Sequence, residues 1–218
     1  MNPTQSSPSI ADFAAMKDAI TSYPIDTLLR QRWSLRSFSD QRVPTEHIGS
    51  LLEAARWAPS SHNEQPWSFF VALKEDAAAF QHLLQVLHED NAEWAQHAPV
   101  LMLAVAKQFH DWKRYANRYA THDVGLAIEN LTIEATALGL GVCQMAGFYG
   151  ERAREVYRIP QGYEPITAMA LGYPANPNTL SEADREEELA PRARKPLSSF
   201  VFTNSWGHVA PFIDSSIS

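Results

Sequence analysis

The sequence predicts one domain of the α+β class, with helices packed around a sheet. Short segments rich in apolar, β-branched and aromatic residues alternate with longer segments whose apolar residues follow the helical period. No internal repeat and no low-complexity linker divides the 218 residues. Apolar residues make up 45% and charged residues 20% of the chain. This composition is ordinary for a globular protein and sufficient for one sizeable core.

The N-terminal half is expected to contain two main helices and a strand. Residues 1–24 are expected to form a polar leader with a short helix, and residues 25–218 the domain itself. Apolar residues recur at the helical period over residues 44–59, between two prolines, which predicts a helix. The aromatic and β-branched segment 67–73 predicts a strand. Residues 76–88 predict a second helix.

The C-terminal half is expected to supply the centre of the core. Residues 100–106 form a continuous apolar run, which is typical of a strand buried on both faces. From Asp123 the apolar residues repeat every three or four positions as far as Gly139, a typical helix C-cap, so a central buried helix is expected. Residues 166–171 predict another strand. The acidic run over residues 182–188 is interpreted as a solvated helix face.

Charge and cysteine content exclude several classes of partner. Lys and Arg number 18 against 25 Asp and Glu, so the formal charge is -7, which argues against a nucleic-acid-binding protein. The single cysteine, Cys143, cannot form an internal disulfide, which fits a reducing compartment. The sequence shows neither a secretory signal nor an apolar run of about 20 residues. A cytoplasmic protein without a membrane or nucleic-acid partner is expected.

Common catalytic motifs are absent from the sequence. Gly139 and Gly141 begin a dinucleotide-binding pattern, but Gln144 stands where its third glycine is required. There is no P-loop, no serine-hydrolase elbow and no histidine pair with metal-ligand spacing, so no metal is expected. Cys143 is interpreted as a buried, inert thiol. A bound cofactor is therefore expected to supply any chemistry.

Three polar segments are candidates for binding that cofactor. Arg32, Ser34 and Arg36 present two guanidinium groups and a hydroxyl within five residues, a donor set suited to phosphate. Residues 58–67 form a prolyl loop dense in short polar side chains. Arg192 and Arg194 project the same way if their segment is extended. Exposed arginines at a helix end and an ordinary turn are the alternative interpretations of the first two segments.

Taken together, these segments resemble the FMN-dependent nitroreductase family. The matching pieces are RWSLRSF (32–38), AARWAPSSHNEQPWSFFV (54–71), GLGVCQMAGF (139–148), MALGYP (169–174) and PRARKPL (191–197). The resemblance implies a nitroreductase-like fold with a central, mainly antiparallel sheet flanked by helices. It also implies an interlaced homodimer with FMN at the subunit boundary. The apolar segment Phe200–Phe202 would then be a C-terminal strand exchanged onto the partner's sheet.

The resemblance also implies roles for individual residues. Arg32 and Ser34, with Arg192 and Arg194, would contact the FMN phosphate, and Arg36 would face the pyrimidine edge of the flavin. Ser60, Ser61 and Asn63 would hold the ribityl chain and ring. The backbone N–H groups of Ala146 and Gly147 would reach N5. Two positions depart from the family: Trp33 replaces a residue that is often basic, and Ala146 one that is often acidic. The complete expected cofactor set is Arg32, Trp33, Ser34, Arg36, Pro59, Ser60, Ser61, Asn63, Gln65, Gln144, Met145, Ala146, Gly147, Arg192 and Arg194.

The expected activity is NAD(P)H-dependent reduction of nitroaromatics, quinones or similar electron-poor acceptors by a ping-pong mechanism. A cation such as Arg36 near N1 would favour the reduced flavin, and no side chain need act as a catalytic acid or base. Aromatic residues after the second strand are the candidate substrate lid: Phe109, Trp112, Tyr115 and Tyr119. Two alternatives remain. The protein could be a reductive dehalogenase that uses Asp111 and Tyr115, one helical turn apart, or a flavin-storage protein with little turnover.

Overall fold

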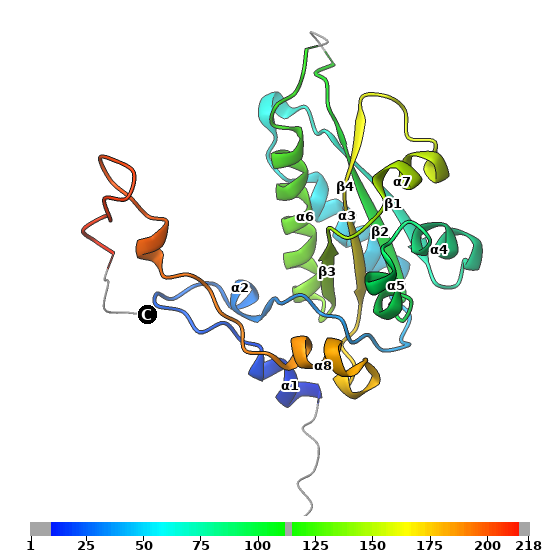
Figure 1. The fold of residues 1–218 in the computed structure, drawn as a ribbon, viewed down its shortest axis with the longest axis horizontal. Coiled ribbons are helices and arrows are strands. Elements are labelled where there is room, and N and C mark those ends of the chain that lie inside the picture. The colour runs from blue at the N-terminus through cyan, green and yellow to red at the C-terminus, as the bar shows by residue number, and fades with distance from the viewer. Residues whose placement is uncertain (1–9, 112–114, 214–218) are drawn as a thin grey trace, which may run out of the picture.

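The computed structural model of the protein describes residues 10–111 and 115–213, and its centre is a four-stranded antiparallel sheet (Figure 1). The strand order is β1-β2-β4-β3. The strands are β1 (Trp67–Leu73), β2 (Val100–Lys107), β3 (Gly141–Met145) and β4 (Tyr163–Gly172). All three neighbouring pairs are antiparallel, so the expected α+β class with an antiparallel sheet is confirmed.

Helices cover both faces of this sheet (Figure 1). One face packs against α3 (Thr45–Arg56) and α6 (Ala120–Ala137), and the other against α4 (Ala77–Leu84), α5 (Glu89–Ala95) and α7 (Gly150–Tyr157). The remaining helices are α1 (Ile10–Met16), α2 (Thr27–Gln31) and α8 (Glu182–Leu189). No helix in the described ranges is long and apolar enough to cross a bilayer.

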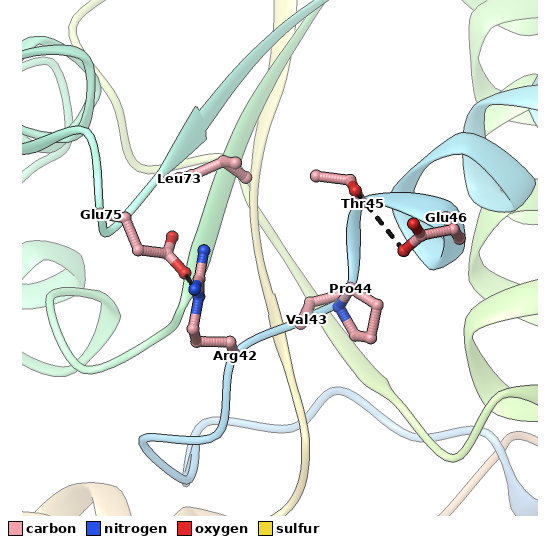
Figure 2. Close-up of a pocket in the computed structure, with 7 residues that line it drawn as sticks. All are labelled: Arg42, Val43, Pro44, Thr45, Glu46, Leu73 and Glu75. Atoms are coloured by element: carbon pink, nitrogen blue, oxygen red, sulfur yellow. Dashed lines mark hydrogen bonds and ion pairs between the residues drawn. The ribbon is translucent and has the colours of Figure 1, made fainter.

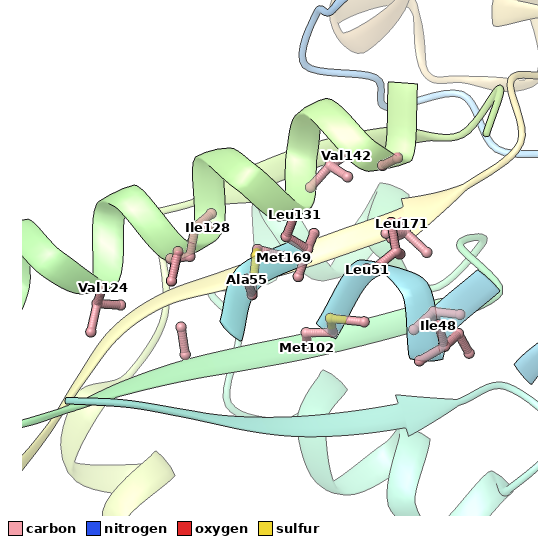
Figure 3. Packing of buried hydrophobic residues seen from close by; sticks show 14 of the residues in the cluster. Ile48, Leu51, Ala55, Met102, Val124, Ile128, Leu131, Val142, Met169 and Leu171 are labelled. Atoms are coloured by element: carbon pink, nitrogen blue, oxygen red, sulfur yellow. The ribbon is translucent and has the colours of Figure 1, made fainter. Parts of the chain in front are cut away.

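The central strand β2 is buried on both sides, as its continuous apolar sequence predicts. Met102 and Ala104 lie in the core beneath α3 and α6, whereas Leu101 and Leu103 lie in the core beneath α4 and α5. Figure 3 shows Met102 beside Leu51 of α3, among side chains of the first core. Burying a side chain of this size contributes about 1.5–3 kcal/mol, so these two layers hold the sheet rigid.

Helix boundaries follow local sequence signals. The side chain of Asp76 accepts a hydrogen bond from the backbone N–H of Ala79 and caps α4, and Ser181 caps α8 in the same way. Helix α6 ends just before Gly139, whose φ of +73° fits the expected C-cap. The helix predicted over 76–88 is shorter than expected. It ends at Leu84, because residue Leu87 instead pairs with Phe148 in an isolated β-bridge.

Both terminal segments make contacts that the sequence did not predict. Within the predicted leader, α1 packs on the body: Phe13 is buried, and the Lys17 ammonium donates to the backbone oxygens of Glu188 and Ala190. At the other end, Phe202 pairs with Val209 of its own chain in an isolated bridge. We call residues 197–213 the C-terminal arm. It lies apart from the sheet in Figure 1, and the exchange of a strand with a partner stays a prediction.

Candidate functional site

The prolyl loop between α3 and β1 has a strained backbone. Three non-glycine residues in this loop, His62, Asn63 and Gln65, have φ values of 54°, 56° and 47°. The left-handed conformation costs an L-residue other than glycine about 1–2 kcal/mol, so other contacts must hold it. Three such residues within four positions are typical of a segment shaped for binding rather than of an ordinary turn.

Hydrogen bonds within the loop supply part of that support. The backbone N–H of Asn63 donates to the carbonyl oxygen of Ser60 at 3.0 Å. The backbone N–H of Gln65 donates to the Ser60 hydroxyl at 3.0 Å, and the Gln65 side-chain amide donates to the carbonyl of Asn63. Pro59, Asn63 and Gln65 are exposed, and both serines are half-buried. The loop residues predicted to bind the cofactor thus form one continuous, internally bonded surface.

A buried carboxylate anchors this loop to α6. Asp123, in the first turn of α6, is 2% exposed and accepts the backbone N–H of Ser61 at 2.9 Å. Its second oxygen lies 2.9 Å from Nδ1 of His122. The sequence interpretation treated Asp123 only as the start of a helix. One signal in the sequence could have identified Asp123 as an anchor. It is an acidic residue in the first turn of a helix whose buried face is otherwise apolar.

Three arginines from opposite ends of the chain gather in a second place. The guanidinium of Arg192 donates to the backbone oxygens of Lys17 and Arg30 at 2.7 and 2.8 Å. Burial lowers the pKa of Arg192, and the charges of Arg32 and Arg194 lower it further. Within residues 10–111 and 115–213, no carboxylate forms an ion pair with Arg32 or Arg194. Because like charges this close repel, the cluster suits a multiply charged anion, and the FMN phosphate fits it.

Arg36 lies in a different environment, because carboxylates of α8 surround it. Its Nη1 atom is 3.0 Å from Asp184 and 2.6 Å from Glu187, and its guanidinium lies 5.6 Å from the centre of the Trp94 ring. Although burial alone would lower it, Glu187 and Asp184 raise the pKa of Arg36. Arg36 is therefore an ion-paired arginine, a pairing that the sequence did not predict.

The acidic run of α8 is accordingly more than a solvated helix face, and this interpretation is corrected. Glu188 is 3% exposed and accepts the Arg36 backbone N–H at 3.0 Å and the Ser37 hydroxyl at 3.3 Å. Burial raises the pKa of the Glu188 carboxyl, whereas these donors favour its charged form. The indole N–H of Trp33 lies near this carboxylate but lacks hydrogen-bond geometry. Trp33 thus packs inward, while Ser34 is exposed.

The end of β3 forms the third part of the expected site. Gln144 and Ala146 are exposed, and Met145 between them is buried. The carbonyl oxygen of Gly147 accepts the backbone N–H of His88 and the side-chain amide of Asn91, each at 3.0 Å. A Cβ at Gly147 would lie 2.4 Å from the Asn91 amide nitrogen, so this close approach requires glycine. Sequence reasoning missed β3 itself and the support from His88 and Asn91.

The prolyl loop and the arginine cluster lie at opposite ends of the sheet within one chain (Figure 1). The loop leads into β1, whose first residue faces Ala106, and Ala106 in turn faces Glu164 near the start of β4. The segment that carries the first arginines runs beside Pro174, just past the end of β4. Ten residues of β4 rise about 3.3 Å each, so roughly 30 Å separate the two ends.

The two described ends of the candidate lid lie side by side in antiparallel directions. Phe109 pairs with Ala116, and the backbone N–H of His110 donates to the carbonyl of Tyr115. Phe109, Tyr115 and Tyr119 are exposed, whereas Trp112 lies outside the described residues. Asp111 pairs with Lys107. The three residues between Asp111 and Tyr115 lie outside the described ranges, so the helical spacing proposed for this pair stays a prediction.

Two hollows in the described surface do not include the prolyl loop. The first, of about 290 Å³, lies between Arg42 and the start of α3; Figure 2 shows Arg42 directed at Glu75 across it. The second, of about 360 Å³, lies between α1, Trp33 and the end of α6. In the described residues no three His, Cys, Asp or Glu side chains could hold a metal ion.

Comparisons with known proteins agree with this geometry. Residues 29–173 match the model of the nitroreductase family. An Archaeoglobus fulgidus protein that carries the name NADH dehydrogenase/NAD(P)H nitroreductase is 31% identical over 166 residues, which cover 72% of this chain and 89% of that protein. The NADPH-dependent FMN reductase of Bacillus subtilis is 30% identical over 165 residues, covering 70% of this chain and 66% of the reductase. The crystal structure of an oxidoreductase containing FMN superposes with a TM-score of 0.80 at 31% identity, over 86% of this chain and 95% of that one.

Proposed function

Because the chain belongs to the nitroreductase family, we propose that it is an FMN-dependent oxidoreductase that passes electrons from NAD(P)H to nitroaromatics, quinones or similar acceptors. The family and the FMN-containing relative make it an oxidoreductase with FMN as cofactor. The nature of the acceptor and the ping-pong order are parts of the proposal. The names of the two sequence relatives, a nitroreductase and an FMN reductase, support electron transfer from NAD(P)H.

The observation that carries the proposal is the arginine cluster. Arg32, Arg192 and Arg194 come from segments about 160 positions apart, and both burial and the charges of Arg32 and Arg194 lower the pKa of Arg192. A phosphate carries about two negative charges near neutral pH, so it would offset this repulsion. Charge-assisted hydrogen bonds of this kind are roughly twice as strong as neutral ones. The cluster would therefore bind FMN through the group that distinguishes it from riboflavin.

The separation of the two donor sets supports a homodimer. One FMN cannot reach both the arginine cluster and the prolyl loop of a single chain if roughly 30 Å separate them. A second copy would bring its prolyl loop to the arginines of the first. The C-terminal arm supports the same assembly, because Phe200, Trp206 and Phe212 are largely exposed on it. Apolar side chains of this size are commonly buried between subunits.

When bound, FMN supplies the two-electron chemistry, and the residues of the chain bind and orient it. The arginine cluster would hold the phosphate, and the prolyl loop would fix the ribityl chain and one side of the ring. The exposed turn at Ala146 and Gly147 would lie beside the ring edge. The sequence contains no separate dinucleotide-binding motif, so the donor and the acceptor would use one open face in turn. This arrangement gives a ping-pong order without an acid or base from the chain.

Cofactor content and turnover test the proposal. The purified protein should be yellow and should release one FMN per chain on denaturation. NAD(P)H oxidation with menadione or nitrofurazone should exceed the rate with the same concentration of free FMN. A colourless protein that fails to take up added FMN would contradict the proposal. Bound FMN without turnover above the free-flavin rate would indicate storage instead.

Sedimentation tests the proposed assembly separately. One chain has a mass of 24.4 kDa, and a species of twice that mass should persist at micromolar concentration. Deleting residues 200–213 should dissociate this species and weaken FMN binding, because the second donor set is then no longer held in place. A monomer that retains stoichiometric FMN would show that one chain forms the whole site.

A further inference from the structure

Asp184 and Glu187, on successive turns of α8, converge on the guanidinium of Arg36. Asp184 lies 3.0 Å and Glu187 2.6 Å from the same nitrogen, Nη1. The Arg36 side chain is 27% exposed, which leaves part of the group open to a ligand. A third carboxylate, Glu188, accepts the Arg36 backbone N–H. Side-chain and backbone contacts from one helix thus fix both the position and the charge of this residue.

The start of helix α8 uses Asp184 but not Glu187. Ser181 accepts the backbone N–H of Asp184 at 3.3 Å, and its hydroxyl donates to Oδ2 of Asp184 at 2.8 Å, a bond that the side-chain oxygen of an asparagine could also accept. The side chain of Glu187 is 67% exposed and bonds to Arg36. An exposed ion pair of this kind contributes at most about 1 kcal/mol to stability. The two side chains therefore have a larger effect on the field around Arg36 than on the fold.

The charge balance at this place is opposite to that of the arginine cluster. Arg36 brings one positive charge, and Asp184 and Glu187 bring two negative charges within 3.0 Å of it. A guanidinium that is already paired attracts a further negative charge less strongly than a free one. Reduced FMN carries more negative charge on its pyrimidine ring than oxidised FMN does. A paired Arg36 next to that ring stabilises the reduced form less than a free Arg36 would.

We propose that Asp184 and Glu187 are positioning residues that hold Arg36 against the flavin ring and set the reduction potential of FMN low by neutralising Arg36. The inference rests on the proposed FMN site, in which Arg36 faces the pyrimidine edge of the flavin as the family resemblance implies. It goes beyond that site because it assigns a role to residues outside the cofactor set. A low potential favours rapid electron transfer from the reduced enzyme to the acceptor. The acidic helix α8 is thus part of the redox machinery.

The test compares two isosteric substitutions with a matched control on the same helix. Glu187→Gln and Asp184→Asn each remove one charge beside Arg36. Glu186→Gln removes the same charge one residue away, from an exposed side chain without a contact to Arg36. For each protein the dissociation constants of oxidised and reduced FMN are measured by flavin fluorescence and absorbance. The potential is measured independently against a reference dye.

Removing the charge of either carboxylate should increase the affinity for reduced FMN relative to that for oxidised FMN. Because water screens the exposed Glu187, we expect this ratio of affinities to rise about threefold in Glu187→Gln. In Asp184→Asn, where the carboxylate is more buried, we expect it to rise about tenfold. For a two-electron couple, a tenfold change raises the potential by about 30 mV. Glu186→Gln should change neither quantity. Equal shifts in Glu186→Gln and Glu187→Gln, or no shift in any variant, would overturn the inference.

A second background distinguishes action through Arg36 from a direct effect of the carboxylates. In Arg36→Gln, the additional Glu187→Gln substitution should no longer shift the potential. A shift as large as in the wild-type background would overturn the positioning role. Wild-type protein that binds no FMN would refute the proposed function, whereas wild-type FMN binding with unchanged variant potentials would refute only this inference.

Discussion

The backbone N–H of Ser61 donates a 2.9 Å hydrogen bond to the carboxylate of Asp123, and this contact joins the strained loop to the first turn of α6. The two residues are 62 positions apart. Asp123 is buried, so its carboxylate depends on such donors to offset the cost of removal from water. The shape of the loop is thus tied to the most buried helix of the domain.

Removing this anchor should destabilise the protein. In Asp123→Ala the Ser61 N–H loses its acceptor, and leaving a buried polar group unsatisfied costs about 1–3 kcal/mol. The free energy of unfolding, measured by urea denaturation, should fall by that amount, and FMN should bind more weakly. Glu129→Ala, on the exposed side of the same helix, is the control and should change stability by less than about 0.5 kcal/mol. Equal stability of the two variants would show that the anchor is dispensable.

The left-handed backbone at His62 should discriminate between substitutions. His62→Gly and His62→Val both remove the ring, including its edge-to-face contact with His110. At a φ of 54°, valine suffers a steric clash that glycine avoids because it has no Cβ. The valine variant should therefore be about 1–2 kcal/mol less stable than the glycine variant. Thermal unfolding of the two proteins measures this difference, and equal stabilities would mean that the loop relaxes at no cost.

Arg194 should contribute to FMN binding through the phosphate alone. Losing a hydrogen bond to a charged group costs about 1.5–3 kcal/mol, so Arg194→Gln should weaken FMN binding at least tenfold. Riboflavin, which lacks the phosphate, should bind both proteins with the same affinity. Titrations of flavin fluorescence measure both constants, with Arg42→Gln as a surface control, since Arg42 pairs with Glu75. A parallel loss for riboflavin would place Arg194 elsewhere in the site.

Cys143 should make stability fall at alkaline pH. Burial raises the pKa of this thiol from its ordinary value of 9.0 to about 11. Between these values the unfolded chain loses the proton that the folded chain keeps. The stabilisation is therefore complete below pH 9 and is lost as pH rises toward 11, by up to about 2–3 kcal/mol. Urea denaturation across this range should show the decline.

Comparison with Cys143→Ala isolates this contribution. Burial also raises the pKa of Tyr157, to about 12, and the variant retains that tyrosine. The difference between the two proteins should therefore change mainly between pH 9 and 11. Iodoacetamide should label Cys143 only after unfolding at pH 8, because the folded thiol is both buried and protonated. Rapid labelling of the native protein would contradict the burial.

The sequence predicted those elements whose signal is local and periodic. Strand β1 has the predicted bounds, and β2 is one residue longer than the predicted run. Strand β2 could be recognised because a strand covered on both faces must be apolar throughout. Strand β3 was missed. It has only five residues, begins with glycine and alternates too briefly to show a period. Strand β3 is held in place by antiparallel pairing with β4, which its own sequence does not indicate.

The site was predictable where its residues are close in sequence. The prolyl loop and the arginines stand out as dense polar motifs, and the structure brings Arg32 together with Arg192 and Arg194 as expected. The pairing of Arg36 with Asp184 joins residues 148 positions apart. Nothing in an acidic run indicates which of its carboxylates faces a cation and which faces water. Contacts of this kind depend on the packing of α8, which periodicity does not determine.

The left-handed residues of the prolyl loop have a consequence for the thermodynamics of ligand association. A loop that must be ordered by its ligand loses conformational entropy at that moment, at a cost of about 1–2 kcal/mol per residue. Here the loop loses this entropy when the chain folds, because its own hydrogen bonds and α6 already hold it before a ligand binds. Association with a flavin should therefore be fast and should show only a small unfavourable entropy.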